Sequence, residues 1–122
     1  MSSFERTLRK LAIGDDEFID SVLAEKAANL ASSQLDQKTH ALVRLASMIA
    51  VDAAAASYMS SIESARRVGA TDEEIVGCLV AVMPTLGPVH VVSAAPKLAL
   101  ALGYDVAAAL EGSDVPVDDS MT

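Results

Sequence analysis

Two histidines are the residues best suited to acid–base chemistry near neutral pH, and one of them has charged neighbours at helical spacing. Asp36, His40 and Arg44 follow one another at intervals of four, so their side chains share one face of a predicted helix. This arrangement allows His40 to act as a catalytic base oriented by Asp36, while Arg44 binds a substrate carboxylate. A solvated helix edge with two favourable side-chain pairs is the alternative interpretation.

His90 is the second catalytic candidate. It follows Gly87-Pro88, a pair that predicts the start of a helix. The amides at a helix N-terminus attract anions, and the helix dipole lowers the pKa of a histidine placed there. In the functional interpretation, His90 transfers a proton or forms a hydrogen bond with a substrate oxygen. The alternative is a structural histidine that is hydrogen-bonded to the backbone.

Four serines form a polar stripe on another predicted helix. They share the spacing of one helix face and are Ser57, Ser60, Ser61 and Ser64. Serine is unfavourable within a helix unless it packs closely or lines a polar cavity. We therefore expect Ser57 and Ser61, with Tyr58 at the rim, to bind substrate. An exposed or close-packed face of small residues is the alternative.

Cys78 is the only cysteine, so no disulfide can form within the chain. It lies in a strongly apolar run, which is typical of a buried small side chain rather than of a reactive thiol. Two isolated histidines and one cysteine supply no recognisable set of metal ligands. We expect no metal and no other cofactor.

The elements that position these residues are predicted to be helices. The chain of 122 residues is 52% hydrophobic and holds 22 alanines, but it has only two Phe, two Tyr and no Trp. Alanine in such quantity, with few aromatic residues, favours closely packed helices over strands. So much apolar surface in a small chain also indicates burial between subunits.

Charge and hydropathy argue against two classes of partner. Nine Lys and Arg stand against 17 Asp and Glu, which leaves no basic footprint for nucleic acid. A membrane-spanning helix needs about 20 consecutive, predominantly apolar residues, and we expect none in this chain. The N-terminal residues also lack the apolar segment of a secretory signal, so we expect a cytoplasmic protein.

Helix start and stop signals follow one another closely. They predict helices over 3–12, from Asp15 or Asp16 to Ser32, from Asp36 to a bend near Asp52, and over 54–68. Three more are predicted from the Thr71–Glu74 capping box to Pro84, from Gly87-Pro88 to Gly103 with a kink or break at Pro96, and over 105–111. We therefore expect one all-α domain at 1–112, a bundle of six to seven helices, and an acidic tail at 113–122.

Three stretches of the sequence resemble the carboxymuconolactone decarboxylase family, which includes the alkylhydroperoxidase D-like proteins. They read LDQKTHALVRLA at 35–46, ARRVGATDEEI at 65–75 and GYD at 103–105. The resemblance covers residues 35–105. It implies an alkylhydroperoxidase D-like helical fold, assembly into homotrimers or homohexamers, and a site among helices near a subunit interface.

The resemblance stops at the redox centre. The redox members of this family carry Cys-x-x-Cys-x-x-x-His, with a Glu twelve residues before the first Cys. Two alignments of this motif are possible here. Counted back from Gly69, its two Cys positions and its His position are Ala54, Ser57 and Ser61. Counted forward from Ala41, which stands in place of the Glu, they are Ala53, Ala56 and Ser60. A thiol peroxidase needs an attacking and a resolving thiol, so peroxidase activity is not expected.

These observations predict a thiol-less relative of that family that binds a small acidic organic molecule. If it is an enzyme, the expected reaction is decarboxylation or isomerisation by proton transfer. His40 or His90 would then be the acid or base, and Arg44 would hold the carboxylate. The alternative is a non-enzymatic oligomeric scaffold or ligand-binding module.

Overall fold

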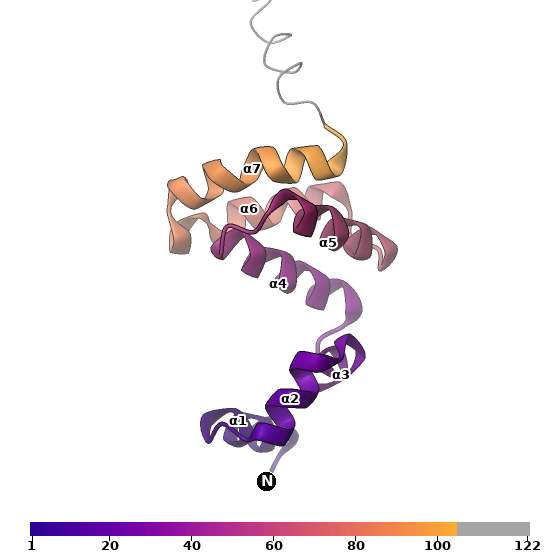
Figure 1. Cartoon of the computed structure of the whole chain (residues 1–122), viewed down its shortest axis with the longest axis vertical. Coiled ribbons are helices and arrows are strands. Elements are labelled where there is room, and N and C mark those ends of the chain that lie inside the picture. The colour runs from indigo at the N-terminus through magenta and orange to yellow at the C-terminus, as the bar shows by residue number, and fades with distance from the viewer. Residues whose placement is uncertain (105–122) are drawn as a thin grey trace, which may run out of the picture. The chain divides into compact units, whose positions relative to one another are not determined.

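The computed structural model describes residues 1–104, and every regular element in this part of the chain is an α-helix. The seven helices of these residues are α1 (Ser3–Ala12), α2 (Asp16–Ala24), α3 (Lys26–Ser33), α4 (Gln37–Ala50), α5 (Ala55–Arg67), α6 (Asp72–Leu86) and α7 (Pro88–Leu102) (Figure 1). The all-α prediction is confirmed. The helix expected over 105–111 and the tail expected at 113–122 lie outside the described residues. Across residues 1–104, no helix combines the length and apolar character needed to cross a membrane.

The chain divides into two compact units, Met1–His40 and the part from Ala41 onward. In the first unit α2 packs against α3 and α1 packs against α2. None of these three helices has a buried residue, so this unit has little hydrophobic core of its own. The expectation of one domain ending at residue 112 stays a prediction.

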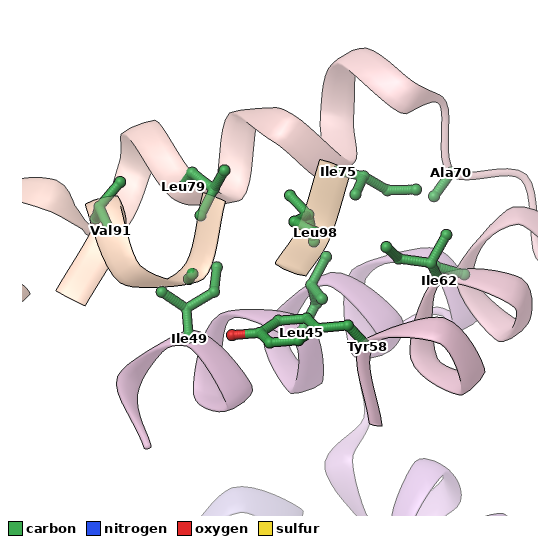
Figure 2. Packing of buried hydrophobic residues seen from close by; sticks show 11 residues of the cluster. Leu45, Ile49, Tyr58, Ile62, Ala70, Ile75, Leu79, Val91 and Leu98 are labelled. Carbon is green, nitrogen blue, oxygen red and sulfur yellow. The ribbon is translucent and has the colours of Figure 1, made fainter. Parts of the chain in front are cut away.

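The second unit contains the hydrophobic core. Here α7 packs against both α5 and α6 (Figure 1). The buried apolar side chains come from α4 to α7 and the loop before α6, and they are Leu45, Ile49, Tyr58, Ile62, Ala65, Ala70, Ile75, Leu79, Val91, Ala94 and Leu98 (Figure 2). Ala65 and Ala94 are fully buried, which is consistent with alanine allowing close helix packing.

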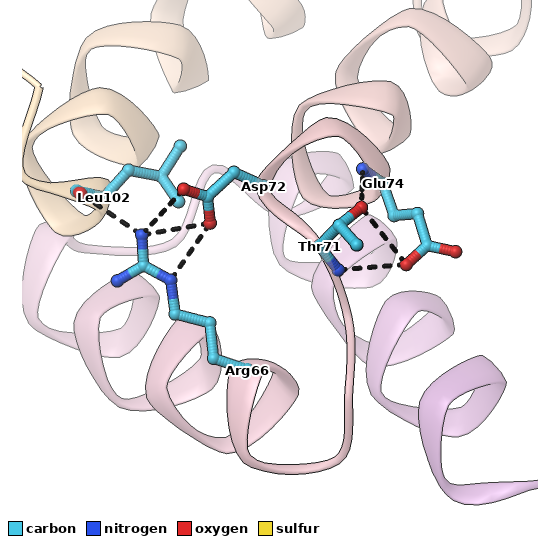
Figure 3. Close-up of polar contacts among 5 residues, drawn as sticks. All are labelled: Arg66, Thr71, Asp72, Glu74 and Leu102. Carbon is cyan, nitrogen blue, oxygen red and sulfur yellow. Dashed lines mark hydrogen bonds and ion pairs between the residues drawn. The ribbon is translucent and has the colours of Figure 1, made fainter.

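Several helix boundaries lie where local sequence predicts them. Asp15 caps α2 by accepting a hydrogen bond from the amide of Phe18 at 2.9 Å. Thr71 and Glu74 form the predicted capping box of α6, with bonds of 3.1 and 2.9 Å (Figure 3). Gly103 has a φ of 86°, a left-handed conformation that favours glycine, and it ends α7.

Two predictions of helix ends are wrong, and the break that was one of the two outcomes expected at Pro96 is absent. The helix expected from residue 15 to 32 is two helices, because Glu25 adopts an extended conformation between α2 and α3. Pro84 does not end α6, which continues to Leu86, and Pro96 does not split α7. Each proline removes a hydrogen bond to the carbonyl four residues earlier, at Val80 and Val92. Both valines are exposed, so water can solvate those carbonyls.

Candidate functional site

A group of polar side chains gathers where the turn between α4 and α5 meets α7. The hydroxyl of Ser93 and the ammonium of Lys97 both donate to Oδ1 of Asp52, at 3.1 and 2.9 Å. Lys97 also donates to the backbone oxygen of Ala53 at 3.2 Å. We call Asp52, His90, Ser93 and Lys97, together with the hydroxyl of Tyr58, the Asp52 cluster.

Local backbone geometry accounts for this arrangement. The chain leaves α4 after Ala50, and Asp52 takes a left-handed conformation with a φ of 53°, which aspartate tolerates better than most residues. On α7, His90, Ser93 and Lys97 are spaced by three and four residues, so they lie along one helix face. The turn therefore presents one carboxylate to two donors on this face, Ser93 and Lys97.

The charges in the cluster shift two pKa values in opposite directions. Hydrogen bonds from Lys97 and Ser93, followed by the charges of Lys97 and His90, lower the pKa of Asp52. Burial, with a smaller contribution from the Asp52 charge, raises the pKa of Tyr58. Asp52 is therefore ionised near neutral pH, while the phenol of Tyr58 keeps its proton.

The hydroxyl of Tyr58 is the unusual feature of the cluster. The residue is 0% exposed, and its hydroxyl has no hydrogen-bond partner in the part of the chain that the structure describes. In Figure 2 this hydroxyl points toward the side of the core where Ile49 lies. A buried hydroxyl without a partner is costly, and it often marks a functional position.

Two of the sequence-predicted site residues, Tyr58 and His90, interact with Asp52 through charge alone, because neither has a hydrogen bond to it within residues 1–104. Ser57 lies next to Tyr58 in the first turn of α5 and is exposed, whereas Ser61 is half-buried. His90 is exposed on the first turn of α7, as the Gly87-Pro88 start predicts. Whether these four side chains bind a substrate stays a prediction.

His40 and Arg44 lie in other surroundings. His40 is 6% exposed, and its Nε2 lies 2.7 Å from Oδ1 of Asn29, which favours Nε2 as the donor. Asp36 caps the start of α4, accepting from the amide of Thr39 at 2.7 Å. Arg44 is exposed, and its guanidinium makes no ion pair or hydrogen bond with any residue of the described range. Their catalytic and carboxylate-binding roles stay predictions.

Comparison with known proteins assigns no family to this chain: no protein-family model matches it, and neither a curated protein nor a solved structure does. A function is therefore argued from the geometry of the side chains.

Sequence reasoning missed three members of the cluster: Asp52, Ser93 and Lys97. Two signals were present in the sequence. Asp52 interrupts an apolar stretch, and Lys97 is the only Lys or Arg after Arg67. Neither signal identifies the partner, because the two residues are 45 positions apart.

A separate apolar cleft lies between α6 and α7. It has a volume of about 530 Å³, and its apolar lining includes Val76, Leu79, Ala95, Leu98, Ala99 and Leu102. Asp72 also lines it, and Arg66 binds both carboxylate oxygens of Asp72, at 3.0 and 3.2 Å, and the carbonyl of Leu102 at 3.2 Å (Figure 3). None of the sequence-predicted site residues lines this cleft.

Neither Cys78 nor a group of metal-binding side chains forms a reactive centre within residues 1–104. The Sγ of Cys78 lies 3.5 Å from the carbonyl of Glu74 and 3.8 Å from that of Leu42. Burial raises the pKa of this thiol, with a smaller contribution from the Glu74 charge, so it is a weak nucleophile near neutral pH. Within residues 1–104, no group of three or more His, Cys, Asp or Glu side chains is placed to hold a metal ion.

Proposed function

We propose that this protein is a thiol-less relative of the carboxymuconolactone decarboxylase family that binds a small organic acid at the Asp52 cluster and transfers a proton on it. The observation that carries the proposal is the pair of hydrogen bonds that Ser93 and Lys97 donate to Asp52, on the face of α7 that also carries His90. Lys97 also contacts Ala53, one of the two positions at which the resemblance aligns the first thiol of the redox members. The resemblance therefore supports the cluster as the site of the proposed chemistry.

Lys97 supplies the carboxylate-binding group in this proposal. Its ammonium has three donors. Asp52 and Ala53 accept two of them, and the third is left for a ligand carboxylate. Asp52 thus positions the ammonium, and its lowered pKa keeps it charged while it does so. Lys97 takes the role that the sequence suggested for Arg44.

His90 supplies the proton transfer. In a decarboxylation, the bond between the carboxylate and a carbon next to a carbonyl group breaks, carbon dioxide leaves, and the electron pair stays on that carbon as an enolate. Protonated His90 then gives its proton to the carbon. In an isomerisation, neutral His90 takes a proton from one carbon and returns it to another. Both require a side chain that titrates near neutral pH.

The test of binding uses acetoacetate and benzoate as probes, followed through backbone amide shifts in NMR spectra. We expect shifts at residues 52–58 and 90–97, loss of binding in Lys97→Met, and no change in the surface control Arg67→Met. Loss in Arg44→Met with binding retained in Lys97→Met would move the carboxylate anchor to Arg44. Absence of shifts near Asp52 for every probe contradicts the proposal.

Turnover is measured separately, as exchange of the acetoacetate C2 protons in deuterated water and as release of carbon dioxide. We expect His90→Gln to abolish the protein-dependent part of both and to keep binding. Binding without either reaction would identify the non-enzymatic ligand-binding module instead.

Self-association into a homotrimer or homohexamer is part of the same proposal. It is supported by the large apolar side chains that the described residues leave exposed, many of them on α1, α6 and α7. Surfaces of this kind mark sites of protein–protein contact. Sedimentation velocity over a range of concentrations tests it, and a monomer at all concentrations would contradict it.

A further inference from the structure

Helix α1 presents an apolar stripe that no residue of its own unit, Met1–His40, covers. Phe4, Leu8 and Leu11 recur at the spacing of one helix face and are 72%, 63% and 51% exposed. The helix is nevertheless well formed, because Ser2 and Glu5 complete a capping box at its start. A helix of ten residues is marginal in water without tertiary packing, so this stripe calls for a partner surface.

The cleft between α6 and α7 has the character of such a surface. It is apolar along most of its lining and offers the small residues Ala95 and Ala99, which leave room for larger side chains. Amphipathic helices bind grooves of this kind through apolar residues spaced three, four and seven apart. The stripe from Phe4 to Leu11 has this spacing and is roughly 10 Å long at 1.5 Å per residue.

Charge also matches the two surfaces. Helix α1 carries Arg6, Arg9 and Lys10 against the single acid Glu5. The cleft ends at Asp72, and Glu73 follows it in the first turn of α6. Arg66 already binds Asp72, whereas Glu73 is exposed and has no ion pair with any residue from 1 to 104. The basic side chains of α1 and the acidic side chains at the start of α6 are therefore complementary in charge.

We propose that α1 of one copy of this chain occupies the α6–α7 cleft of a second copy. This inference rests on the proposed self-association and names the surfaces that form it. No residue of Met1–His40 covers the stripe, and no side chain from 41 to 104 fills the cleft, so a second copy can cover each. Every copy carries one stripe and one cleft, and their exchange satisfies both surfaces in a closed assembly.

The test compares matched pairs of variants by sedimentation velocity. Leu8→Glu charges the stripe, and Ile13→Glu is its control, since Ile13 is 66% exposed and lies just past the end of α1. Ala99→Phe fills the cleft, and Ala50→Phe, at an exposed position of α4, is its control. We expect Leu8→Glu and Ala99→Phe each to weaken association at least about tenfold, and the controls to leave it unchanged.

Mixing the Leu8→Glu and Ala99→Phe proteins tests whether a second copy of the chain, rather than another molecule, occupies the cleft. The Leu8→Glu chain keeps an intact cleft and the Ala99→Phe chain keeps an intact stripe, so an equimolar mixture should recover association that neither shows alone. Loss of thermal stability in Leu8→Glu with unchanged mass would mean that α1 covers its own chain. An effect of Ala99→Phe without one of Leu8→Glu would assign the cleft to another ligand. Both results overturn the proposal.

Two further outcomes keep this inference distinct from the proposals on which it rests. If the wild type associates and all four variants associate equally well, the cleft exchange is wrong and self-association stands. If the wild type is a monomer, both fail together. Binding of an acid at the Asp52 cluster is measured through other residues, so neither result changes the conclusion about it.

Discussion

Lys97 Nζ lies 2.9 Å from Oδ1 of Asp52, and this one contact joins the middle of α7 to the turn that precedes α5. Both side chains are partly exposed, at 31% and 53%, so the pair contributes little to the free energy of unfolding. Its larger effect is electrostatic. The ion pair keeps the Asp52 carboxylate charged beside the Lys97 ammonium. The charge of His90 also acts on Asp52, and the charge of Asp52 acts on Tyr58.

Replacing Lys97 with Met should raise the pKa of Asp52 toward its ordinary value, because the hydrogen bond from Lys97 is the largest cause of the lowering. A carboxyl group with a lowered pKa in the folded state stabilises the protein above its unfolded pKa, about pH 4. That contribution is lost as pH falls through the folded pKa. The free energy of unfolding of the wild type should therefore exceed that of Lys97→Met near neutral pH. In strong acid this difference should disappear.

The measurement is a carbon-detected NMR titration of the Asp52 carboxyl group in both proteins, with chemical denaturation at each pH. Lys26→Met, in the first unit, is the control and should leave the Asp52 titration unchanged. An Asp52 titration that does not move in Lys97→Met would mean that the ion pair is absent in solution.

Replacing Tyr58 with Phe should raise the free energy of unfolding by about 1 kcal/mol, because it removes a buried hydroxyl that has no partner. The aromatic ring stays in the core. Tyr104→Phe alters a hydroxyl at an exposed position and should change stability by only a few tenths of a kcal/mol. Urea denaturation of both variants checks the difference, and a clear loss of stability in Tyr58→Phe would show that the hydroxyl is bonded in solution.

Local sequence determined much of the fold because the signals that start helices are local. Asp15 and the Thr71–Glu74 capping box act on amides three residues away, so both could be recognised without any tertiary structure. The break between α2 and α3 at Glu25 could not be predicted, because no glycine or proline lies near it in the sequence. Pro84 misled in the opposite direction, because its effect depends on whether the carbonyl of Val80 is solvated.

The candidate site was predictable only in part for a related reason. His90 could be selected by residue type and by its place at a helix start, and Tyr58 by its place beside the serine stripe. Their common neighbour could not, because Asp52 meets Ser93 and Lys97 across 41 and 45 positions of the chain. That contact exists because α7 folds back over the start of α5, which no local pattern encodes.

Replacing Arg66 with Met should lower the free energy of unfolding by up to about 1 kcal/mol. Arg66 binds both oxygens of Asp72 and also the carbonyl of Leu102, so it links the ends of three helices. Arg67→Met is a matched control at the next position, since its ion pair with Glu63 is 3.6 Å long and well exposed. Its loss should cost almost nothing. The difference should shrink in high salt, as denaturation with and without added salt can show.

The thiol of Cys78 should react slowly with Ellman's reagent near neutral pH. Burial raises the pKa of this thiol, so little thiolate is present, and its half-buried position restricts access. We expect a rate at least about tenfold below that of free cysteine. Unfolding the protein in guanidinium chloride should remove the difference.

A second thiol at an exposed position provides the control for this prediction. Ser57→Cys in a Cys78→Ser background places the sulfur in the first turn of α5, where the side chain is exposed. This thiol should react faster than Cys78, because exposure and the helix N-terminus both favour its thiolate. Equal rates for the two proteins would contradict the burial of Cys78, and with it the argument that the native cysteine is structural and carries no thiol chemistry.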